Sequence, residues 1–484
     1  MRKLLFVGCL ASAGAVWATP SISGVQASPR DGGKAVRIVY TLANEPAVVT
    51  LGLYEKATGA CIGEGAYTNL AGDVNCLVQP GGTRKTIVWT KGSDWTRADG
   101  DVDVRLRAWP TNCPPDYLVL NLTDIEKKVP ARYYVSTNAF PVPLADVMYR
   151  TTHLVMRKIP AANVEWRMGS PAKEANRELT VGDASSAGEN QHYVRLTEDF
   201  YLGIYPVTYR QHCYGVNDGK NYGAWSSTAG DFAAVRKDDW PYLQTQFVSL
   251  RSWMHDSNPG KDCHGECGVE TKCWPEYGHE IDEKNSPTCV KSTKGPYTPY
   301  LRWWRDRYGF EFDLPTDAQW EFACRAGTSG AVYLEGLPAC YTNALTAAQL
   351  NEISWNVNNS FDETVQCVTP HVVGQKRPNA FGLYDMIGNV FEWCLNVSDT
   401  PARSAEAVVD PVGRTGKDND RGRACIVRGG SYASHVGYCR SAARGAMSTT
   451  GLSNPGYADP SVKSAATVSW HAGYRLWLPA QAAR

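Results

Sequence analysis

Short runs in which apolar and polar residues alternate dominate the chain between residues 34 and 110. Alternation with a period of two is typical of β-strands that bury one face. Turn sequences rich in Gly, Pro and Asp separate the runs, which are "KAVRIVYTL", "AVVTLGLYE", "RKTIVWTK" and "VDVRLRAWP". The pattern predicts a small all-β domain at this end of the chain.

We expect these strands to form a β-sandwich of the immunoglobulin or fibronectin type over residues 19–112. Cys61 and Cys76 flank a turn region that contains Gly and Asn, so a disulfide between them is also expected. No residue pattern with evident chemistry falls in this domain, which is therefore interpreted as a spacer or a binding module. Residues 113–146 are interpreted as a linker.

The second domain, residues 147–484, is rich in Trp, Gly and Tyr and has few long helical periods. It contains an insertion at about residues 216–297. One helix is predicted to follow "YPVTYRQHCYGV", and another lies in "LPTDAQWEFACRAG". In the latter, Thr316 stands where an N-cap would, and Gln319 can complete a capping box.

Charge and the first residues narrow the class of protein. Of the 484 residues, 49 are Lys or Arg and 49 are Asp or Glu, so no basic field argues for a nucleic acid partner. Residues 1–18 are predicted to be a signal peptide, because Arg2 and Lys3 precede an apolar stretch and a small-residue cleavage site ends at Ala18. No later apolar run reaches the roughly 18 residues of a membrane span. We therefore expect an exported, soluble protein, either periplasmic or secreted.

The cysteine count agrees with export. Without Cys9, 14 of the 15 cysteines remain, an even number that predicts disulfides for most of them. The segment "KDCHGECGVETKCWPEYGHE" has a spacing close to that of zinc ligands. In an exported chain two disulfides are the preferred interpretation and zinc is the alternative. The residues concerned are Cys263, His264, Cys267, Cys273, His279 and Cys289.

Several longer motifs occur in a fixed order in the second domain: "WRMGSP", "FYLGIYPVTYRQ", "LPTDAQWEFACRAGT", "GQKRPNAFGLYDMIGNVFEWC", "VRGGSYA", "CRSAARG" and "GYRLW". Together they resemble the sulfatase-modifying-factor family, whose best-known member is the formylglycine-generating enzyme. The resemblance covers roughly residues 150–480. It implies an α+β class with a variant C-type-lectin-like fold, low in regular secondary structure, held together by turns, buried Trp and often calcium.

Charged residues within these motifs are expected to stabilise the fold rather than bind substrate, because paired charges are what permit burial. Four arginines are candidates for buried bidentate pairs with Asp385, Glu321 or Glu392. These arginines are Arg428, Arg440, Arg444 and Arg475.

The resemblance also implies a chemistry. The family enzyme oxidises a sulfatase cysteine to formylglycine with O2 and copper(I), held by two thiolates, and soft thiolates suit this ion. Aligned without a gap, Ser431, His435 and Cys439 match family positions, whereas Ser434 stands where the first cysteine should be. Aligned from the "CRSAAR" side, Cys439 matches no ligand. The thiol pair is incomplete in both alignments, and Cys425 is either a substitute or, preferably, the disulfide partner of Cys439.

Calcium is implied separately by "GNVFEW". In the family such a stretch supplies oxygen ligands, so Asn389 and Glu392 would give side-chain oxygens and Val390 a carbonyl, which are appropriate to Ca²⁺. The alternative is that Glu392 pairs with an arginine and no ion is bound.

Two functions follow, with a third left open. The first is a non-catalytic binding protein whose loops, including "NYGAWSS" and "WPEYGHE", contact a protein, peptide or glycan. The second is an oxidase acting on sulfatase-like substrates, with Cys439 as metal thiolate, Ser431 and His435 positioning oxygen or substrate, and Trp393 lining the pocket. The third is a binding protein diversified at its C-terminal end. A second free thiol near Cys439 would favour the oxidase.

Overall fold

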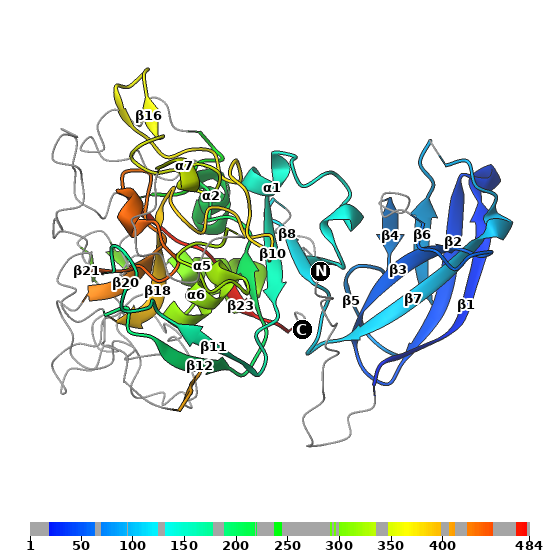
Figure 1. Cartoon of the computed structure of the whole chain (residues 1–484). Coiled ribbons are helices and arrows are strands. Elements are labelled where there is room, and N and C mark those ends of the chain that lie inside the picture. The colour runs from blue at the N-terminus through cyan, green and yellow to red at the C-terminus, as the bar shows by residue number, and fades with distance from the viewer. Residues whose placement is uncertain are drawn as a thin grey trace. The chain divides into compact units, whose positions relative to one another are not determined.

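The structure is a computed structural model in which the chain divides into two compact units (Figure 1). Unit 1 is Met1–Asn121, Glu126–Asp146 and Ala480–Arg484, and unit 2 is Leu122–Ile125 and Val147–Pro479. The structure describes residues 19–62, 69–93, 95–123, 131–177, 188–217, 219, 237–243, 291–292, 295–296, 300–334, 347–397, 406–411, 424–448 and 471–481. The predicted signal peptide, the zinc-like cysteines and the loops "NYGAWSS" and "WPEYGHE" lie outside these residues.

Unit 1 contains two antiparallel sheets and a hairpin. The first sheet has the order β1 (Ser21–Arg30), β2 (Ala35–Ala43), β6 (Lys85–Thr90) and β4 (Leu70–Gly72). The second has the order β5 (Leu77–Val78), β3 (Ala47–Glu55) and β7 (Val102–Pro110). The hairpin pairs β8 (Tyr117–Asn121) with β9 (Ala131–Tyr134). Strands β2, β3, β6 and β7 fall on the alternating runs of the sequence.

Alternation also decides which side chains enter the core of unit 1. Ile38 and Tyr40 of β2 belong to the same buried hydrophobic cluster as Leu51 and Leu53 of β3. The two sheets therefore share one core, as expected for strands with one apolar face. Cys61 and Cys76 are both free thiols, so the predicted disulfide between them is not formed.

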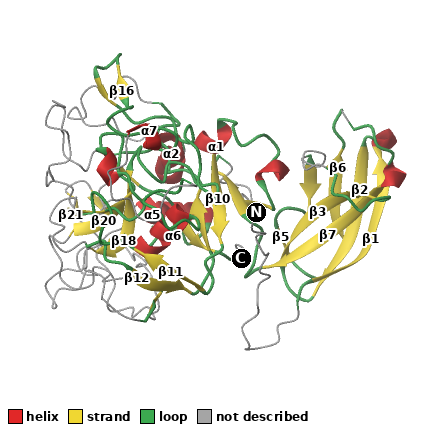
Figure 2. Ribbon diagram, in the orientation of Figure 1, coloured by secondary structure: helices red, strands yellow, loops and turns green. Residues whose placement is uncertain are grey.

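Unit 2 mixes short helices with short strands (Figure 2). The helices described are α1 (Met148–Thr151), α2 (Tyr209–Asn217), α5 (Tyr300–Tyr308), α6 (Asp317–Arg325) and α7 (Ala347–Leu350). Short 3-10 turns are η1 (Asp31–Gly33), η3 (Asp99–Asp101) and η4 (Thr137–Ala139) in unit 1 and η7 (Val436–Tyr438) in unit 2. Within the described part of the chain, no helix is long and apolar enough to cross a membrane. A mixed α and β class, with few helices and many strands in the described residues, is thus confirmed.

The strands of unit 2 form small sheets. One contains β23 (Trp477–Pro479), β13 (Phe200–Gly203) and β10 (His153–Ile159), and another β11 (Val164–Met168), β12 (His192–Leu196) and β19 (Val408–Val409). A four-stranded sheet has the order β21 (Arg444–Ser448), β20 (Ala424–Arg428), β18 (Phe391–Val397) and β22 (Ala472–Gly473). Two strand pairs complete the set, β14 (Lys291–Ser292) with β15 (Gly295–Pro296) and β16 (Phe361–Asp362) with β17 (Cys367–Val368).

The two predicted helices of unit 2 differ in outcome. The Thr316 hydroxyl accepts from the Gln319 amide at 3.1 Å, and the Gln319 side chain accepts from the Thr316 amide at 2.9 Å, so the capping box of α6 is confirmed. The other prediction was wrong in position. Helix α2 begins at Tyr209, inside "YPVTYRQHCYGV" rather than after it, because the Thr208 hydroxyl accepts from the Gln211 amide at the helix start.

Strand β18 brings distant motifs together. Glu392 lies opposite Arg428 of β20 in an antiparallel pair and opposite Gly473 of β22 in a parallel pair. The motifs "GNVFEW", "VRGG" and "GYRLW" are therefore neighbours in one sheet. This sheet positions the residues that the sequence indicates as a site.

Candidate functional site

Backbone hydrogen bonds join three segments around the predicted site. The Asn389 amide donates to the Trp355 carbonyl at 2.8 Å, and the Asn389 carbonyl accepts from the Tyr432 amide at 2.9 Å. The Val357 amide donates to the Ser434 carbonyl at 3.1 Å. Segment 354–360 is thus hydrogen-bonded to both of the other segments.

Gly388 makes this close approach possible. Its φ is +80°, and a Cβ there would lie 2.3 Å from both the Ser354 hydroxyl and the Trp355 carbonyl oxygen. A side chain would be excluded on both grounds, so the glycine is required by contact and by conformation. The motif "GN" therefore locks segment 354–360 against β18.

Cys439 is the candidate thiolate, and its thiol is fully buried and free. Burial raises the pKa of the Cys439 thiol to about 12, although a hydrogen bond with Ser354 and the charge of Arg440 oppose the shift. A Cβ at Gly430 would lie 2.9 Å from the sulfur, which shows how closely the backbone packs on it. The preferred disulfide to Cys425 is not formed. At neutral pH the thiol is protonated and shielded, the state of an unreactive cysteine.

Ser431 and Ser434 bind each other. The Ser434 hydroxyl accepts from the Ser431 amide at 2.9 Å, and the two hydroxyl oxygens are 3.1 Å apart. Both side chains are buried. The hydrogen-bonding capacity of the two hydroxyls is therefore used within the loop that carries them.

His435 and Trp393, the other predicted site residues, lie in contrasting environments. His435 is exposed, and its Nδ1 accepts from the Gly437 amide at 3.3 Å at the start of η7. Trp393 is fully buried in β18, opposite Val427 of β20. The structure thus brings Cys439, Ser431 and Ser434 into one buried loop, with His435 on its surface and Trp393 in the adjoining sheet.

The donor set of the loop does not fit copper(I). This ion prefers soft thiolate ligands, and here a hydroxyl stands at position 434 beside a protonated thiol at 439. The Ser434 hydroxyl already binds Ser431. No group of three or more His, Cys, Asp and Glu side chains that could hold a metal ion occurs within the described ranges.

The residues expected to bind calcium do not fit that ion either. Both carboxylate oxygens of Glu392 bind the Arg475 guanidinium, at 2.6 to 3.1 Å, and one also accepts from the Trp320 indole nitrogen at 2.7 Å. The Asn389 side chain bonds to the His371 backbone at both ends, at 3.0 and 3.1 Å. Calcium requires six to eight oxygen ligands, whereas the side-chain oxygens of Glu392 and Asn389 already accept hydrogen bonds from protein donors.

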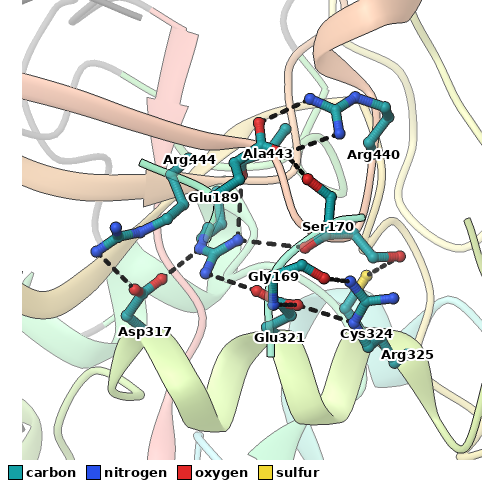
Figure 3. A network of polar contacts seen from close by, with 12 residues as sticks. Gly169, Ser170, Glu189, Asp317, Glu321, Cys324, Arg325, Arg440, Ala443 and Arg444 are labelled. Carbon is teal, nitrogen blue, oxygen red and sulfur yellow. Dashed lines mark hydrogen bonds and ion pairs between the residues drawn. The ribbon is translucent and has the colours of Figure 1, made fainter. Parts of the chain in front are cut away.

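Arginines and carboxylates form a buried network beneath the site (Figure 3). Arg428 is fully buried and pairs with Asp317 and, at 3.0 Å, with Glu321, both on α6. Arg444 pairs with the other oxygen of Asp317 at 3.0 Å. Figure 3 shows Asp317 directed at Arg444 and Glu321 directed at Arg325, which it binds at 2.8 Å. The acidic N-terminal turns of α6 are thereby joined to β20 and β21.

Arg440 extends this network to a second pair of acids. Its guanidinium binds Glu174 at 2.6 Å and Glu189 at 2.7 Å, and all three side chains are buried. It also donates to the Asn176 carbonyl at 2.9 Å. We term Arg440 with Glu174 and Glu189 the clamp. Because Cys439 directly precedes Arg440, the clamp holds the end of the candidate loop in place.

The predicted acidic partners were right in two cases out of three. Glu321 and Glu392 pair with arginines, as expected, but Asp385 does not. One Asp385 oxygen accepts from the Gly374 amide at 2.7 Å, and the other makes no hydrogen bond with any residue that the structure describes. Burial raises the pKa of the Asp385 carboxyl to about 6. The Asp385 backbone has a φ of 53°, which lies in the left-handed region.

Comparisons with known proteins show the family of the chain. The family model of the sulfatase-modifying factor enzyme 1-like domain matches residues 158–455, and the chain belongs to this family. Formylglycine-generating enzyme of Mus musculus is 34% identical over 129 residues, which is 26% of this chain and 32% of that protein. The enzyme of that name from Streptomyces coelicolor is 33% identical over 151 residues, 29% of this chain and 41% of that protein.

The chain thus spans only about a third to two-fifths of the length of these two relatives. Among solved structures, Treponema denticola variable protein 1 is similar at 19% identity and a TM-score of 0.39, over 68% of this chain and 95% of that one.

Proposed function

We propose that the chain is an exported, non-catalytic member of its family that binds a protein, peptide or glycan through the loops of unit 2. In this proposal unit 2 has a C-type-lectin-like fold and unit 1 is an immunoglobulin-like sandwich. The observation that carries the proposal is the buried hydroxyl pair of Ser431 and Ser434, at the place where the family enzyme would need a thiol.

The state of Cys439 supports the same conclusion. A copper(I) site needs thiolates that a substrate can approach, and Cys439 is fully buried with a pKa raised to about 12. Ser354 supplies its hydrogen bond, so the neighbouring polar group is again a hydroxyl.

The buried arginine network supports a binding role in a different way. It fixes the base of the loops through charge-assisted hydrogen bonds, which are shorter and stronger than neutral ones. A rigid base that carries variable loops is a common arrangement for recognition, because ordering costs are met before the ligand arrives.

The second candidate function is a copper-dependent oxidase that converts a cysteine of sulfatase-like substrates to formylglycine. Its support is the identity of 33% to 34% with proteins named formylglycine-generating enzyme, together with the thiol of Cys439. If it were active, Cys439 would bind the metal, and Ser431, Ser434 and His435 would position oxygen or substrate beside Trp393. Copper would supply oxygen activation.

Copper(I) titration separates the two candidates. The protein is titrated anaerobically against a chromophoric copper(I) chelator, and oxygen uptake is then followed with a cysteine-containing peptide. We expect neither tight binding nor uptake from the natural chain. Tight stoichiometric binding with peptide-dependent uptake would overturn the non-catalytic proposal.

Ser434→Cys tests whether replacing the Ser434 hydroxyl oxygen by sulfur is enough to create copper(I) binding. Ala433→Cys is the matched control in the same loop. We expect copper(I) affinity to rise in the first variant and to stay unchanged in the second. Equal behaviour of the two variants would mean that position 434 is not the missing ligand position.

A further inference from the structure

One face of unit 1 carries aromatic and arginine side chains in alternation. In the sheet of β5, β3 and β7, residues such as Leu51 and Leu106 belong to the core. The alternate residues of the same strands lie on the opposite face, because successive side chains of a strand point to opposite sides. On that face, which we term the outer face, lie Thr50, Gly52, Tyr54, Asp103, Arg105, Arg107 and Trp109.

The arginines of the outer face are stacked on its rings. The guanidinium carbon of Arg107 lies 3.5 Å from the centroid of the Trp109 ring, and that of Arg105 lies 4.2 Å from the centroid of the Tyr54 ring. Both distances are within the range of cation–π attraction. The two stacks occupy neighbouring positions, since Arg105 and Arg107 are two residues apart on β7.

Each ring is itself held in place. The Trp109 indole nitrogen donates to the Thr50 hydroxyl across the strand pair at 2.9 Å. A Cβ at Gly52 would lie 2.7 Å from the Tyr54 ring, so the glycine leaves room for that ring to lie over β3. The guanidinium groups are therefore arranged before any ligand arrives.

The two arginines differ in their charge partners. Arg105 donates to the Asp103 carboxylate at 2.8 Å, and these side chains are 53% and 44% exposed. Arg107 is exposed, and its guanidinium makes no hydrogen bond or ion pair with any residue that the structure describes. The outer face thus presents a flat, oriented cation whose N–H groups are available.

We propose that the outer face binds a sulfated glycan through Arg107, with Arg105 beside it. A guanidinium offers parallel N–H donors that match a sulfate oxyanion in bidentate fashion. The guanidinium groups cover the rings of Tyr54 and Trp109, so a neutral sugar has no open ring to stack on. The ligand must therefore be recognised by its anionic groups.

The outer face belongs to unit 1, and this proposal does not depend on the function proposed for the loops of unit 2. The chain has no excess of basic residues that would attract every polyanion, because Lys+Arg and Asp+Glu number 49 each. A polyuronate would present carboxylates with the same charge and is the alternative source of an oxyanion.

Titration calorimetry of the full chain with dextran sulfate tests the proposal, with unsulfated dextran and alginate as comparison polymers. We expect binding of dextran sulfate that weakens with salt, no binding of dextran, and weaker binding of alginate. Tighter binding of alginate, or no binding of dextran sulfate, would overturn the assignment.

Variants make the test specific. Arg107→Gln is expected to weaken binding of dextran sulfate roughly tenfold, and Arg107→Lys to recover only part of the loss, because Lys keeps the charge without the planar fork. Arg37→Gln, an exposed arginine on β2 of the other sheet, is the matched control and should bind as the natural chain does. An equal loss in Arg37→Gln and Arg107→Gln would show diffuse attraction and defeat the proposal.

Discussion

The Arg475 guanidinium binds both carboxylate oxygens of Glu392, and both side chains are fully or almost fully buried. The same arginine donates to the carbonyls of Gly203 and Tyr384, each at 2.8 Å. The Arg475 side chain thus ties β13, β18 and the turn at Tyr384 before β18 to the C-terminal motif. Glu392 thus makes the arginine pair that the sequence offered as the alternative to a calcium ligand.

Removal of Arg475 alone should lower the free energy of unfolding. Arg475→Met leaves Glu392 buried without its counter-charge, and we expect a loss of about 3–5 kcal/mol in the free energy of unfolding. Urea denaturation of both proteins measures it. The double variant Arg475→Met with Glu392→Gln should lose less, since no unpaired charge remains.

Removal of calcium tests whether Glu392 binds this ion rather than Arg475. If Glu392 held calcium, added EGTA would lower the Tm of the natural chain and not that of Glu392→Gln. We expect the two proteins to respond alike. A response confined to the natural chain would restore calcium to this position.

Asp385 should make stability depend on pH. Its folded pKa of about 6 lies above the ordinary value of 3.8 because of burial, so the folded state binds a proton more readily. The stabilisation from this proton is fully present below about pH 3.8 and is lost as pH rises to about 6. The difference amounts to about 3 kcal/mol.

Denaturation of Asp385→Asn and the natural chain at pH 4, 5, 6 and 7 tests this dependence. We expect the variant to gain relative to the natural chain as pH rises, by up to about 3 kcal/mol. Glu363→Gln, at an exposed position, is the control and should show a constant difference. A difference that does not change with pH for Asp385→Asn would contradict the assignment.

How far the sequence predicts this molecule depends on the range of the interaction. The capping box of Thr316 and Gln319 is local and was predicted correctly, as were the alternating strands of unit 1. The partners of Arg440 could not be predicted, because Glu174 and Glu189 lie 266 and 251 residues away and in no periodic segment. Pairing at such separations is fixed by the fold.

The candidate loop shows the same division. Its motif located Ser434 and Cys439 together, but nothing in "SWNVNNS" indicated that Ser354 would reach the thiol. Asp385 was expected to pair with an arginine because of its charge. Its backbone conformation at φ 53° and its bond to Gly374 decide otherwise, and neither has a sequence signature.

The thiol of Cys439 should resist alkylation in the folded protein. Its burial and a pKa of about 12 leave almost no thiolate at pH 7.5. Mass spectrometry after iodoacetamide treatment should find it unmodified until denaturant is added. Cys61 is an exposed free thiol in the structure and serves as the internal control that reacts at once in reduced protein.

A disulfide at Cys439 after purification under non-reducing conditions would contradict the structure. Rapid alkylation of Cys439 in the folded protein would contradict the shielding. The second result would also revive the oxidase, because an accessible thiolate is its first requirement.

Arg440 should be the residue on which the candidate loop depends most. Arg440→Ala leaves Glu174 and Glu189 buried and close to one another, and we expect a loss of about 3–5 kcal/mol in the free energy of unfolding at pH 7. The loss should shrink as pH falls, since protonation removes the repulsion between the two carboxylates. Burial already raises the pKa of the Glu174 carboxyl in the natural chain.

Hydrogen exchange shows whether the effect is local. In Arg440→Ala, protection should fall at the amides of Ser170 and Glu174 and in η7, which lie at either side of the clamp. Protection in β3 and β7 of unit 1 should not change, and these strands are the matched internal control. Arg302→Ala, which removes an exposed ion pair with Asp306 on α5, should leave both regions as they are. If Arg440→Ala and Arg302→Ala gave the same exchange pattern, the clamp would have no special role in holding the loop.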